Sequence, residues 1–231
     1  THPAPATGFP EDFAARVLDD ALAHEARVLG ISGLQGTGKS TLAAQIVDTA
    51  ASRGLRAMAV SLDDFYLDRP QRLQLARDVH PLLATRGPPG THAVALACTT
   101  LDRLRAGDAM RVPVFDKLGD RRLPEAQWRD TLGNDLVIFE GWCLATPPQP
   151  ADALAEPINA LERHEDPDGT WRVTTRHCGN ASTGCCSCSH RASTSCPNGD
   201  GSRSNRCRHA THRARAWPAR RSNASCSTTN G

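Results

Sequence analysis

Residues 33 to 40 hold the pattern most typical of phosphate chemistry in this chain, Gly-Leu-Gln-Gly-Thr-Gly-Lys-Ser. It is a complete Walker A pattern, G-x-x-x-x-G-K-S. The glycines let successive backbone N–H groups surround an anionic phosphate chain. Lys39 can reach the β- and γ-phosphates, and the Ser40 hydroxyl can bind magnesium. We therefore predict a nucleotide-binding loop made of Gly33, Gly36, Thr37, Gly38, Lys39, Ser40 and Thr41.

The residues on either side of this loop support the interpretation. Val28 to Ser32 form a short apolar run typical of a buried parallel strand, and apolar residues recur at helical spacing from Lys39 to Arg53. A strand, a glycine-rich loop and a helix in this order place a bound phosphate at the helix N-terminus. A glycine-rich turn that arose by chance would lack these flanking elements.

The elements that must position the loop alternate between strands and helices, which indicates an α/β fold with a parallel sheet. Further strands are expected at 56–62 and 135–140, with a short strand or extended piece at 112–117. Further helices are expected at 11–24 and 94–106, and the proline- and glycine-rich segment 81–92 is expected to be a structured loop. Right-handed crossovers then place the phosphate loop at the carboxyl edge of the sheet.

Three acidic residues follow the expected strands at the same edge. Asp63 and Asp64 come directly after the second strand, and Glu140 ends the third after four apolar residues. Phosphoryl transfer needs a carboxylate on the magnesium side and a group that accepts the proton of the attacking hydroxyl. Glu140 suits the first role and Asp63 the second. The alternatives are a helix cap or turn for the aspartates and a solvated strand end for Glu140.

Basic residues in two further segments suggest an anionic substrate. Arg86-Gly-Pro-Pro-Gly-Thr-His92 is a rigid loop with cationic and hydrogen-bonding side chains, and a second basic cluster contains Lys117. Each basic residue taken singly is more often an ordinary surface charge. Their concentration beside a phosphate loop favours a small anionic substrate.

Composition divides the chain into two unequal parts. Residues 1–171 carry 17 basic and 24 acidic side chains, a net charge of −7, whereas residues 172–231 carry 10 and 1, a net charge of +9. We expect a disordered N-terminus at 1–10, a kinase domain at 11–171 and a disordered tail at 172–231. No apolar run approaches the length of a membrane span and no signal-like segment is seen, so we expect a cytoplasmic protein with no membrane contact.

Taken together, the motifs resemble those of D-glycerate 3-kinases of the bacterial and plant type. These are P-loop kinases related to uridine kinase, phosphoribulokinase and bacterial pantothenate kinase. The matching segments are GLQGTGKSTLA (33–43), SLDDFYL (61–67), VHPLLATRGPPGTH (79–92), FDK (115–117), LVIFEGWC (136–143), PINALE (157–162) and DPDGTW ending at Trp171. The phosphate loop is common to many kinases, while the combination with SLDDFY, RGPPGTH and IFEGW is much more specific.

The resemblance implies a three-layer P-loop kinase fold and a phosphotransferase with an alcohol group as acceptor. It implies transfer of the ATP γ-phosphate to the 3-hydroxyl of D-glycerate, with Mg²⁺ held by Ser40 and Glu140, Lys39 on ATP, and Asp63 as the base. The implied substrate-side residues are Asp64, Tyr66, Arg86, His92 and Lys117. The chain departs from the family pattern at Ala93 and at the single Asp120 before Arg121.

Two other functions fit the same residues. One is a kinase for another small hydroxyl substrate, such as a nucleoside or pantothenate. The other is a nucleotide-binding protein that retains the loop but does not catalyse.

The resemblance stops at Trp171, where the composition changes. Val173 is the single residue of the types Leu, Ile, Val, Met and Phe between 172 and 231, so the tail cannot build a core. We hypothesise that the tail is translated out of frame, because a shifted reading of 221–231 with GC-rich codons can spell an amphipathic helix. The nucleotide sequence near codons 172–173 tests this hypothesis.

If the tail is out of frame, it replaces the strands and helices that the family has at its C-terminal side. We expect Val28–Ser32 to have an unpaired edge, the lid and part of the adenine pocket to be missing, and activity to be poor or absent. The tail also has alternative interpretations. Its seven cysteines suggest a disulfide framework or, with three histidines, a zinc site, and its Arg-rich stretch 203–221 suggests nucleic-acid binding. We expect neither zinc nor nucleic acid.

Overall fold

The computed structural model describes residues 8–147, 149–175 and 193–195. The chain consists of two compact units, residues 1–196 and residues 197–231. Every described residue belongs to the first unit. Residues 1–7 and most of the tail lie outside the described residues, as do all seven tail cysteines and the Arg-rich stretch 203–221, on which the alternative interpretations of the tail rest.

The described residues form helices and strands in alternation. The labelled α-helices are α1 (Glu11–Ala23), α2 (Lys39–Ser52), α3 (Arg69–Asp78), α4 (Val94–Ala106) and α5 (Ala160–Glu165). Residues 170–175 are helical as well. The short 3₁₀ helices are η1 (Leu62–Phe65), η2 (Pro81–Ala84), η3 (Glu125–Gln127) and η4 (Asp152–Leu154). The strands are β1 (Val28–Ser32), β2 (Ala57–Ser61), β3 (Met110–Val112), β4 (Phe115–Asp116), β5 (Arg121–Arg122), β6 (Arg129–Thr131), β7 (Leu136–Gly141) and β8 (Ser193–Ser195).

The main sheet has the strand order β2-β7-β1-β8, and all its pairings are parallel. β7 lies between β1 and β2, with Ile31 opposite Glu140 and Ser61 also opposite Glu140. The expectation of an unpaired edge on β1 is wrong for Gly30–Ser32, because these residues pair with β8. The pairing supplies backbone hydrogen-bond partners, which depend little on side-chain type.

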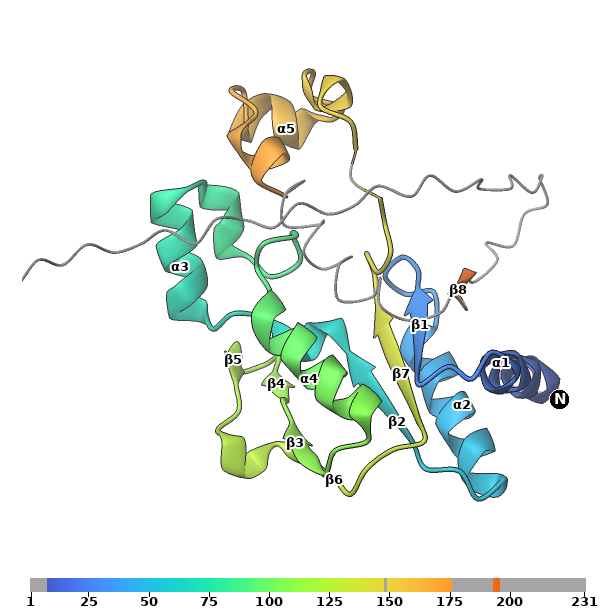
Figure 1. Ribbon diagram of the computed structural model, residues 1–231. Coiled ribbons are helices and arrows are strands. Elements are labelled where there is room, and N and C mark those ends of the chain that lie inside the picture. Colours follow the sequence, from blue (N-terminus) through green and yellow to red (C-terminus); the bar gives the residue numbers. More distant parts are fainter. Residues whose placement is uncertain (1–7, 148, 176–192, 196–231) are drawn as a thin grey trace, which may run out of the picture. The chain divides into compact units, whose positions relative to one another are not determined.

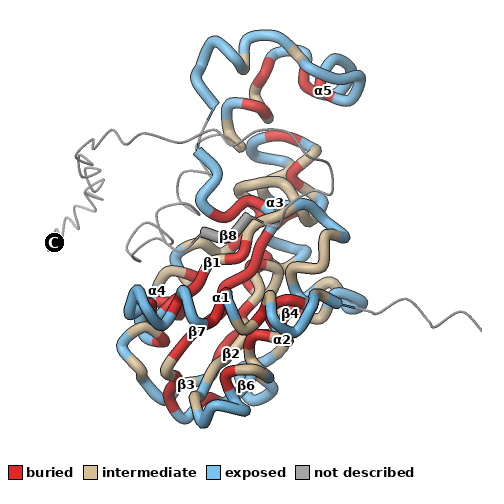
Figure 2. Tube along the Cα trace, turned by 90° about the vertical axis from the view of Figure 1, so that its right-hand side faces the viewer, coloured by how far each residue is buried: buried red, intermediate tan, exposed pale blue. Residues whose placement is uncertain are grey.

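β7 is buried along its whole length, as its apolar sequence predicts. Leu29 and Ile138 belong to a core cluster with α1 and α2, whereas Val137 and Phe139 belong to a second cluster with α4. Figure 1 shows α4 and the α1–α2 pair on opposite faces of the sheet, and Figure 2 shows buried residues running along β1 and β7. The predicted three-layer α/β fold is confirmed.

Several short elements differ from the expectations. The extended piece expected at 112–117 is two strands, because Pro113, which cannot donate to a ladder, separates β3 from β4. β3 pairs with β6, and β4 pairs with β5 as a hairpin. The expected loop 81–92 begins with η2, and α3 was not predicted at all.

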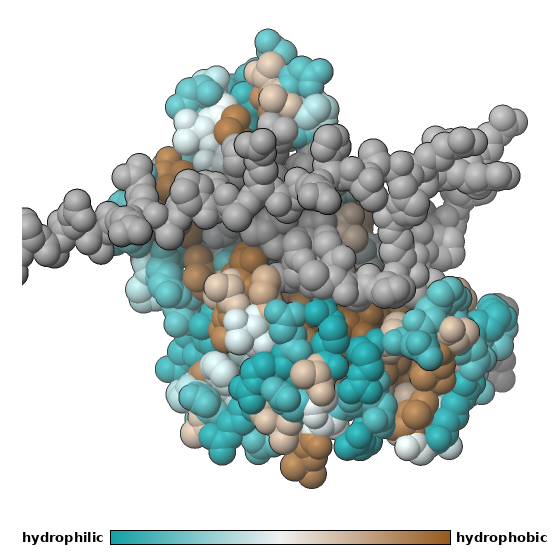
Figure 3. Space-filling model, in the orientation of Figure 1, coloured by the Kyte–Doolittle hydropathy of each residue, from teal (hydrophilic) through white to brown (hydrophobic). Residues whose placement is uncertain are grey.

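The N-terminal end of the described chain is ordered from Phe9 onward. The side chain of Gln45 on α2 accepts from the Phe9 N–H at 3.0 Å and donates to its carbonyl at 2.7 Å, while the Phe9 ring stacks on Phe13. The disorder expected for 1–10 therefore does not extend to Phe9. None of the described helices is long and apolar enough to cross a bilayer. Figure 3 shows a mainly hydrophilic face with apolar residues in separate patches.

Candidate active site

The phosphate loop has the backbone geometry that its glycines allow. Gly36 and Gly38 have φ values of +78° and +84°, in the left-handed region that favours glycine. Gly38 caps α2, so the positive end of that helix faces the loop. The Lys39 Nζ donates to the Leu34 carbonyl at 2.9 Å, and the Thr37 hydroxyl donates to the same carbonyl at 2.7 Å.

Ser40 and Glu140 meet at the carboxyl edge of the sheet. The Ser40 Oγ donates to Glu140 Oε1 at 3.2 Å, and Glu140 is buried. Parallel pairing of β1 with β7 sets this meeting, because it places the end of one strand beside the end of the other. The described residues hold no cluster of three or more His, Cys, Asp or Glu able to enclose a metal. Two hard oxygen atoms fit Mg²⁺, which takes few protein ligands and completes its shell with water and phosphate.

Asp63 lies in η1, directly after β2. Ser61 caps η1 and accepts from the Asp63 N–H at 3.2 Å. The Asp63 Oδ2 accepts from Lys117 Nζ at 2.6 Å, across 54 residues of sequence. The structure thus brings together the acidic residue of SLDDFY and the lysine of FDK.

Asp64 occupies a different environment from its neighbour. Its carboxylate accepts from the Phe115 N–H at 3.3 Å and pairs with Arg129 at 3.2 Å, which joins η1 to β4 and β6. Burial raises the pKa of the Asp64 carboxyl, and the Arg129 charge opposes the rise. These contacts give Asp64 a structural part in holding the site together.

One cavity of about 890 Å³ collects most of the predicted residues, a size typical of small-molecule sites. Its described walls come from the phosphate loop, η1, the loop after η2, the β4–β5 turn, the end of β7 and the segment after α5. They are Leu34, Gln35, Gly36, Lys39, Ser40, Asp63, Tyr66, Arg86, Gly87, Pro88, Pro89, Lys117, Glu140, Gly141, Trp142 and Trp171. Of the predicted substrate residues, Asp64 and His92 are absent from these described walls.

His92 lies behind the cavity wall, against Tyr66. The two rings stack with their centroids 4.3 Å apart, and the backbones of the two residues form an antiparallel bridge. Burial raises the pKa of the Tyr66 hydroxyl most, Asp63 raises it further, and the Arg86 charge opposes the rise. Tyr66 is therefore buried between the ring of His92 and the charged groups of the cavity.

Burial also lowers the pKa of His92 from 6.5 to about 4, with the Asp63 charge opposing the change. Both ring nitrogens are buried without a hydrogen-bond partner among the described residues. The fold favours the neutral ring, so the unfolded chain binds the proton more readily, and stability falls as pH decreases through 6.5 toward 4.

We expect His92 to lower the free energy of unfolding by roughly 2 kcal/mol between about pH 7 and about pH 5. Urea denaturation at both values measures this change. The variant His92→Phe keeps the stacking surface and removes the titrating group, so its loss of stability should be smaller by that amount. An identical loss in both proteins would contradict the prediction.

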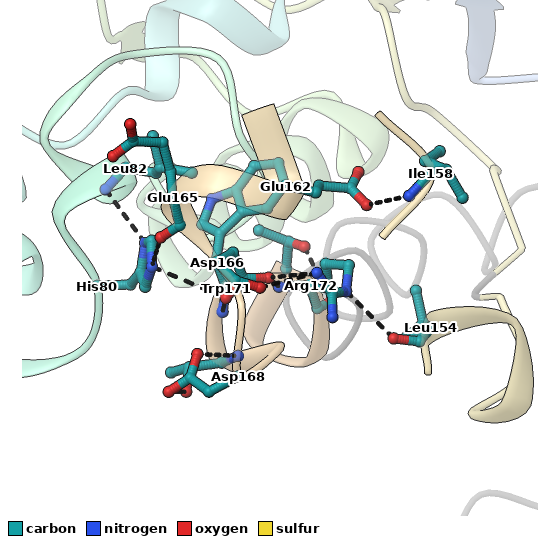
Figure 4. Close-up of polar contacts among 12 residues, drawn as sticks. His80, Leu82, Leu154, Ile158, Glu162, Glu165, Asp166, Asp168, Trp171 and Arg172 are labelled. Atoms are coloured by element: carbon teal, nitrogen blue, oxygen red, sulfur yellow. Dashed lines mark hydrogen bonds and ion pairs between the residues drawn. The ribbon is translucent and has the colours of Figure 1, made fainter. Parts of the chain in front are cut away.

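A buried polar cluster places Trp171 in the cavity wall (Figure 4). The Asp166 side chain is fully buried and accepts from the backbone N–H groups of Trp171 at 2.8 Å and Arg172 at 3.1 Å. Its Oδ2 also pairs with the Arg172 guanidinium at 3.3 Å. His80, just before η2, shares a hydrogen bond of 2.8 Å with the Glu165 carbonyl.

The domain predicted from the sequence ends at Trp171. The structure includes Arg172, which is buried and also bonds to the Leu154 carbonyl at 3.1 Å. The signal in the sequence was the Asp-Pro-Asp-Gly run, whose turn residues bring Asp166 back onto the following backbone.

Comparison of the sequence with known proteins identifies two kinases. The chain is 36% identical over 132 residues to an uncharacterized kinase of Schizosaccharomyces pombe, mug58, covering 52% of this chain and 47% of that protein. It is 34% identical over 140 residues to the chloroplastic D-glycerate 3-kinase of Arabidopsis thaliana, covering 55% and 30%. The chain thus spans less than half of the length of each of these relatives. No protein-family model matches it.

Comparison of the structure gives the same result. A D-glycerate 3-kinase from Cryptococcus neoformans superposes with a TM-score of 0.58 and 26% identity, covering 74% of this chain and 66% of that one. The YGR205w protein superposes with a TM-score of 0.56 and 27% identity, covering 71% and 62%. By sequence and by structure, this chain has D-glycerate 3-kinases among its homologues.

Proposed function

We propose that the protein is an ATP-dependent kinase that transfers the γ-phosphate to the 3-hydroxyl of D-glycerate. The observation that carries the proposal is the single cavity lined by Lys39, Ser40, Glu140 and Asp63. A phosphate cradle, a metal-side carboxylate and a candidate base are the parts that phosphoryl transfer needs. The D-glycerate 3-kinases among the homologues supply the acceptor.

The predicted residues of the cavity have proposed roles in the reaction. The loop backbone and Lys39 bind the phosphates of ATP. Asp63, fixed in place by Lys117, accepts the proton of the acceptor hydroxyl. Ser40 and Glu140 would hold Mg²⁺, which neutralises charge on the phosphates when it is bound. Arg86, Tyr66 and Lys117 form the acceptor side of the cavity, while Asp64 and His92 support it from behind.

An acceptor panel tests the proposal. The purified chain is incubated with γ-labelled ATP, Mg²⁺ and either D-glycerate, a nucleoside or pantothenate, and the products are identified. We expect label in D-glycerate, on the 3-hydroxyl, in preference to the other acceptors. Preferential label in another acceptor would reassign the substrate. ATP binding without transfer to any acceptor would contradict the proposal and indicate a nucleotide-binding protein.

A further inference from the structure

The described walls of the cavity contain three cationic side chains, which lie on the phosphate side and on the acceptor side. Lys39 belongs to the phosphate loop, whereas Arg86 and Lys117 come from segments that pack beside Asp63. Lys117 already has a partner, the Asp63 carboxylate. Arg86 also lines the cavity, and its contacts indicate which ligand group it can bind.

The Arg86 guanidinium is held on two sides and has an unused nitrogen. Its Nε pairs with Asp120 Oδ1 at 3.3 Å, and its Cζ lies 5.5 Å from the centre of the Phe115 ring. Its Nη1 is buried and has no hydrogen-bond partner among the described residues. The side chain as a whole is 30% exposed and lines the cavity, so the guanidinium is open to a ligand through its other atoms.

Asp120 is fixed from behind by a buried arginine. Both of its carboxylate oxygens accept from Arg72 Nη2, at 2.7 and 2.6 Å, and Arg72 is almost fully buried. Asp120 has a φ of +53°, an unusual conformation for a residue other than glycine. Strained backbone of this kind is found where the surrounding structure dictates a side-chain position, often at a functional site.

The Phe115 ring, which packs against the Arg86 guanidinium, is itself held by other aromatic residues. It meets the Tyr66 ring edge-on at 5.6 Å, and Tyr66 in turn stacks on His92. Arg86 therefore packs on Phe115 and His92 on the adjoining Tyr66, and these two residues are the ends of the RGPPGTH segment. The segment between them is anchored at both ends, which limits movement of the guanidinium.

We propose that Arg86, positioned by Asp120, binds the carboxylate of the acceptor, and so selects hydroxy acids over uncharged alcohols. This inference rests on the proposed function. Guanidinium groups recognise carboxylates through paired N–H donors, and such charge-assisted bonds are stronger than neutral ones. A carboxylate at Arg86 leaves the acceptor hydroxyl free to reach Asp63 in the same cavity. Asp120 acts through Arg86 and is a positioning residue.

Calorimetric titration of D-glycerate and of its uncharged amide, glyceramide, tests the subsite. We expect the unmodified protein to bind D-glycerate about 10- to 100-fold more tightly than glyceramide. Arg86→Gln should remove most of that preference by weakening D-glycerate binding alone, and Arg86→Lys should restore part of it. Asp120→Asn keeps the backbone conformation accessible and should weaken D-glycerate binding severalfold without changing ATP affinity.

Arg121→Gln is the matched control, because Arg121 is an exposed arginine on the same hairpin and is absent from the described cavity walls. It should leave both affinities unchanged. Equal weakening of D-glycerate and glyceramide by Arg86→Gln would make Arg86 a structural residue and overturn the proposal. Weakened ATP binding would assign Arg86 to a phosphate instead and also overturn it.

A third ligand separates this proposal from the proposed function. D-lactate carries the carboxylate but lacks the 3-hydroxyl, so it should bind with the same dependence on Arg86. Arg86-dependent binding of D-glycerate and D-lactate without phosphoryl transfer would leave the subsite standing and contradict the kinase. Absence of any carboxylate preference in the unmodified protein would overturn the subsite.

Discussion

Replacing Asp63 with asparagine should lower the rate of phosphoryl transfer to D-glycerate by about 10²- to 10⁴-fold, the usual contribution of a general base. Asparagine has nearly the same shape and can still accept a hydrogen bond from Lys117, which lies 2.6 Å from the carboxylate. It cannot accept a proton at neutral pH. The substitution therefore removes the proton acceptor and preserves the shape of the cavity.

The affinity for ATP should change little in Asp63→Asn, because the phosphate loop and the Ser40–Glu140 pair are untouched. Initial rates and a separate nucleotide titration measure the two effects. Asp130→Asn is the control, since Asp130 is an exposed carboxylate that pairs with Arg111 on β3. An Asp63 variant with full activity would exclude this residue as the base.

The second large effect concerns stability. Asp166→Ala should destabilise the segment that carries Trp171 by about 3–5 kcal/mol, because removing one partner of a buried ion pair leaves the other charge uncompensated. Here the stranded charge is the Arg172 guanidinium. The backbone N–H groups of Trp171 and Arg172 also lose their acceptor.

Hydrogen exchange of those two backbone amides measures the loss directly. Their protection should fall by at least about a hundredfold in Asp166→Ala. Asp168→Ala is the matched control two residues away, because the exposed Asp168 forms side-chain hydrogen bonds to its neighbour Thr170 and not, among the described residues, to Trp171 or Arg172. Unchanged protection in Asp166→Ala would show that the segment is held by other contacts.

Much of the central fold follows from sequence patterns that act locally. The bounds of β1, α2 and α4 agree with the expectations to within one residue, because apolar periodicity and the Gly107 stop signal depend on near neighbours. β7 was recognised for a similar reason, since a strand buried on both faces must be apolar throughout.

The helix α3 was missed because its buried residue is charged. Arg72 is the one buried side chain of this helix, so no apolar stripe marks it. The signal was instead at its N-terminus, where Asp68 and Gln71 form a capping box around Pro70. The function of Arg72 emerges only when the chain folds, because its partner Asp120 lies 48 residues away.

The residues of the candidate site also differ in how far the sequence predicts them. Residues within one motif, such as Lys39 and Ser40, were predictable because spacing alone places them on one loop. Asp120 appeared in the sequence only as a departure from the family pattern, and Trp171 as the end of a motif. The position of Asp120 depends on its contact with Arg72, 48 residues away in the sequence, which spacing does not encode.

Two tryptophans, Trp142 and Trp171, belong to the described walls of the cavity. Trp142 directly follows β7, and Trp171 is carried by the segment that Asp166 anchors. Indole fluorescence responds to the polarity of its surroundings, so filling the cavity should alter the emission spectrum. The protein thus contains its own optical reporter, with which colourless and unlabelled ligands can be titrated.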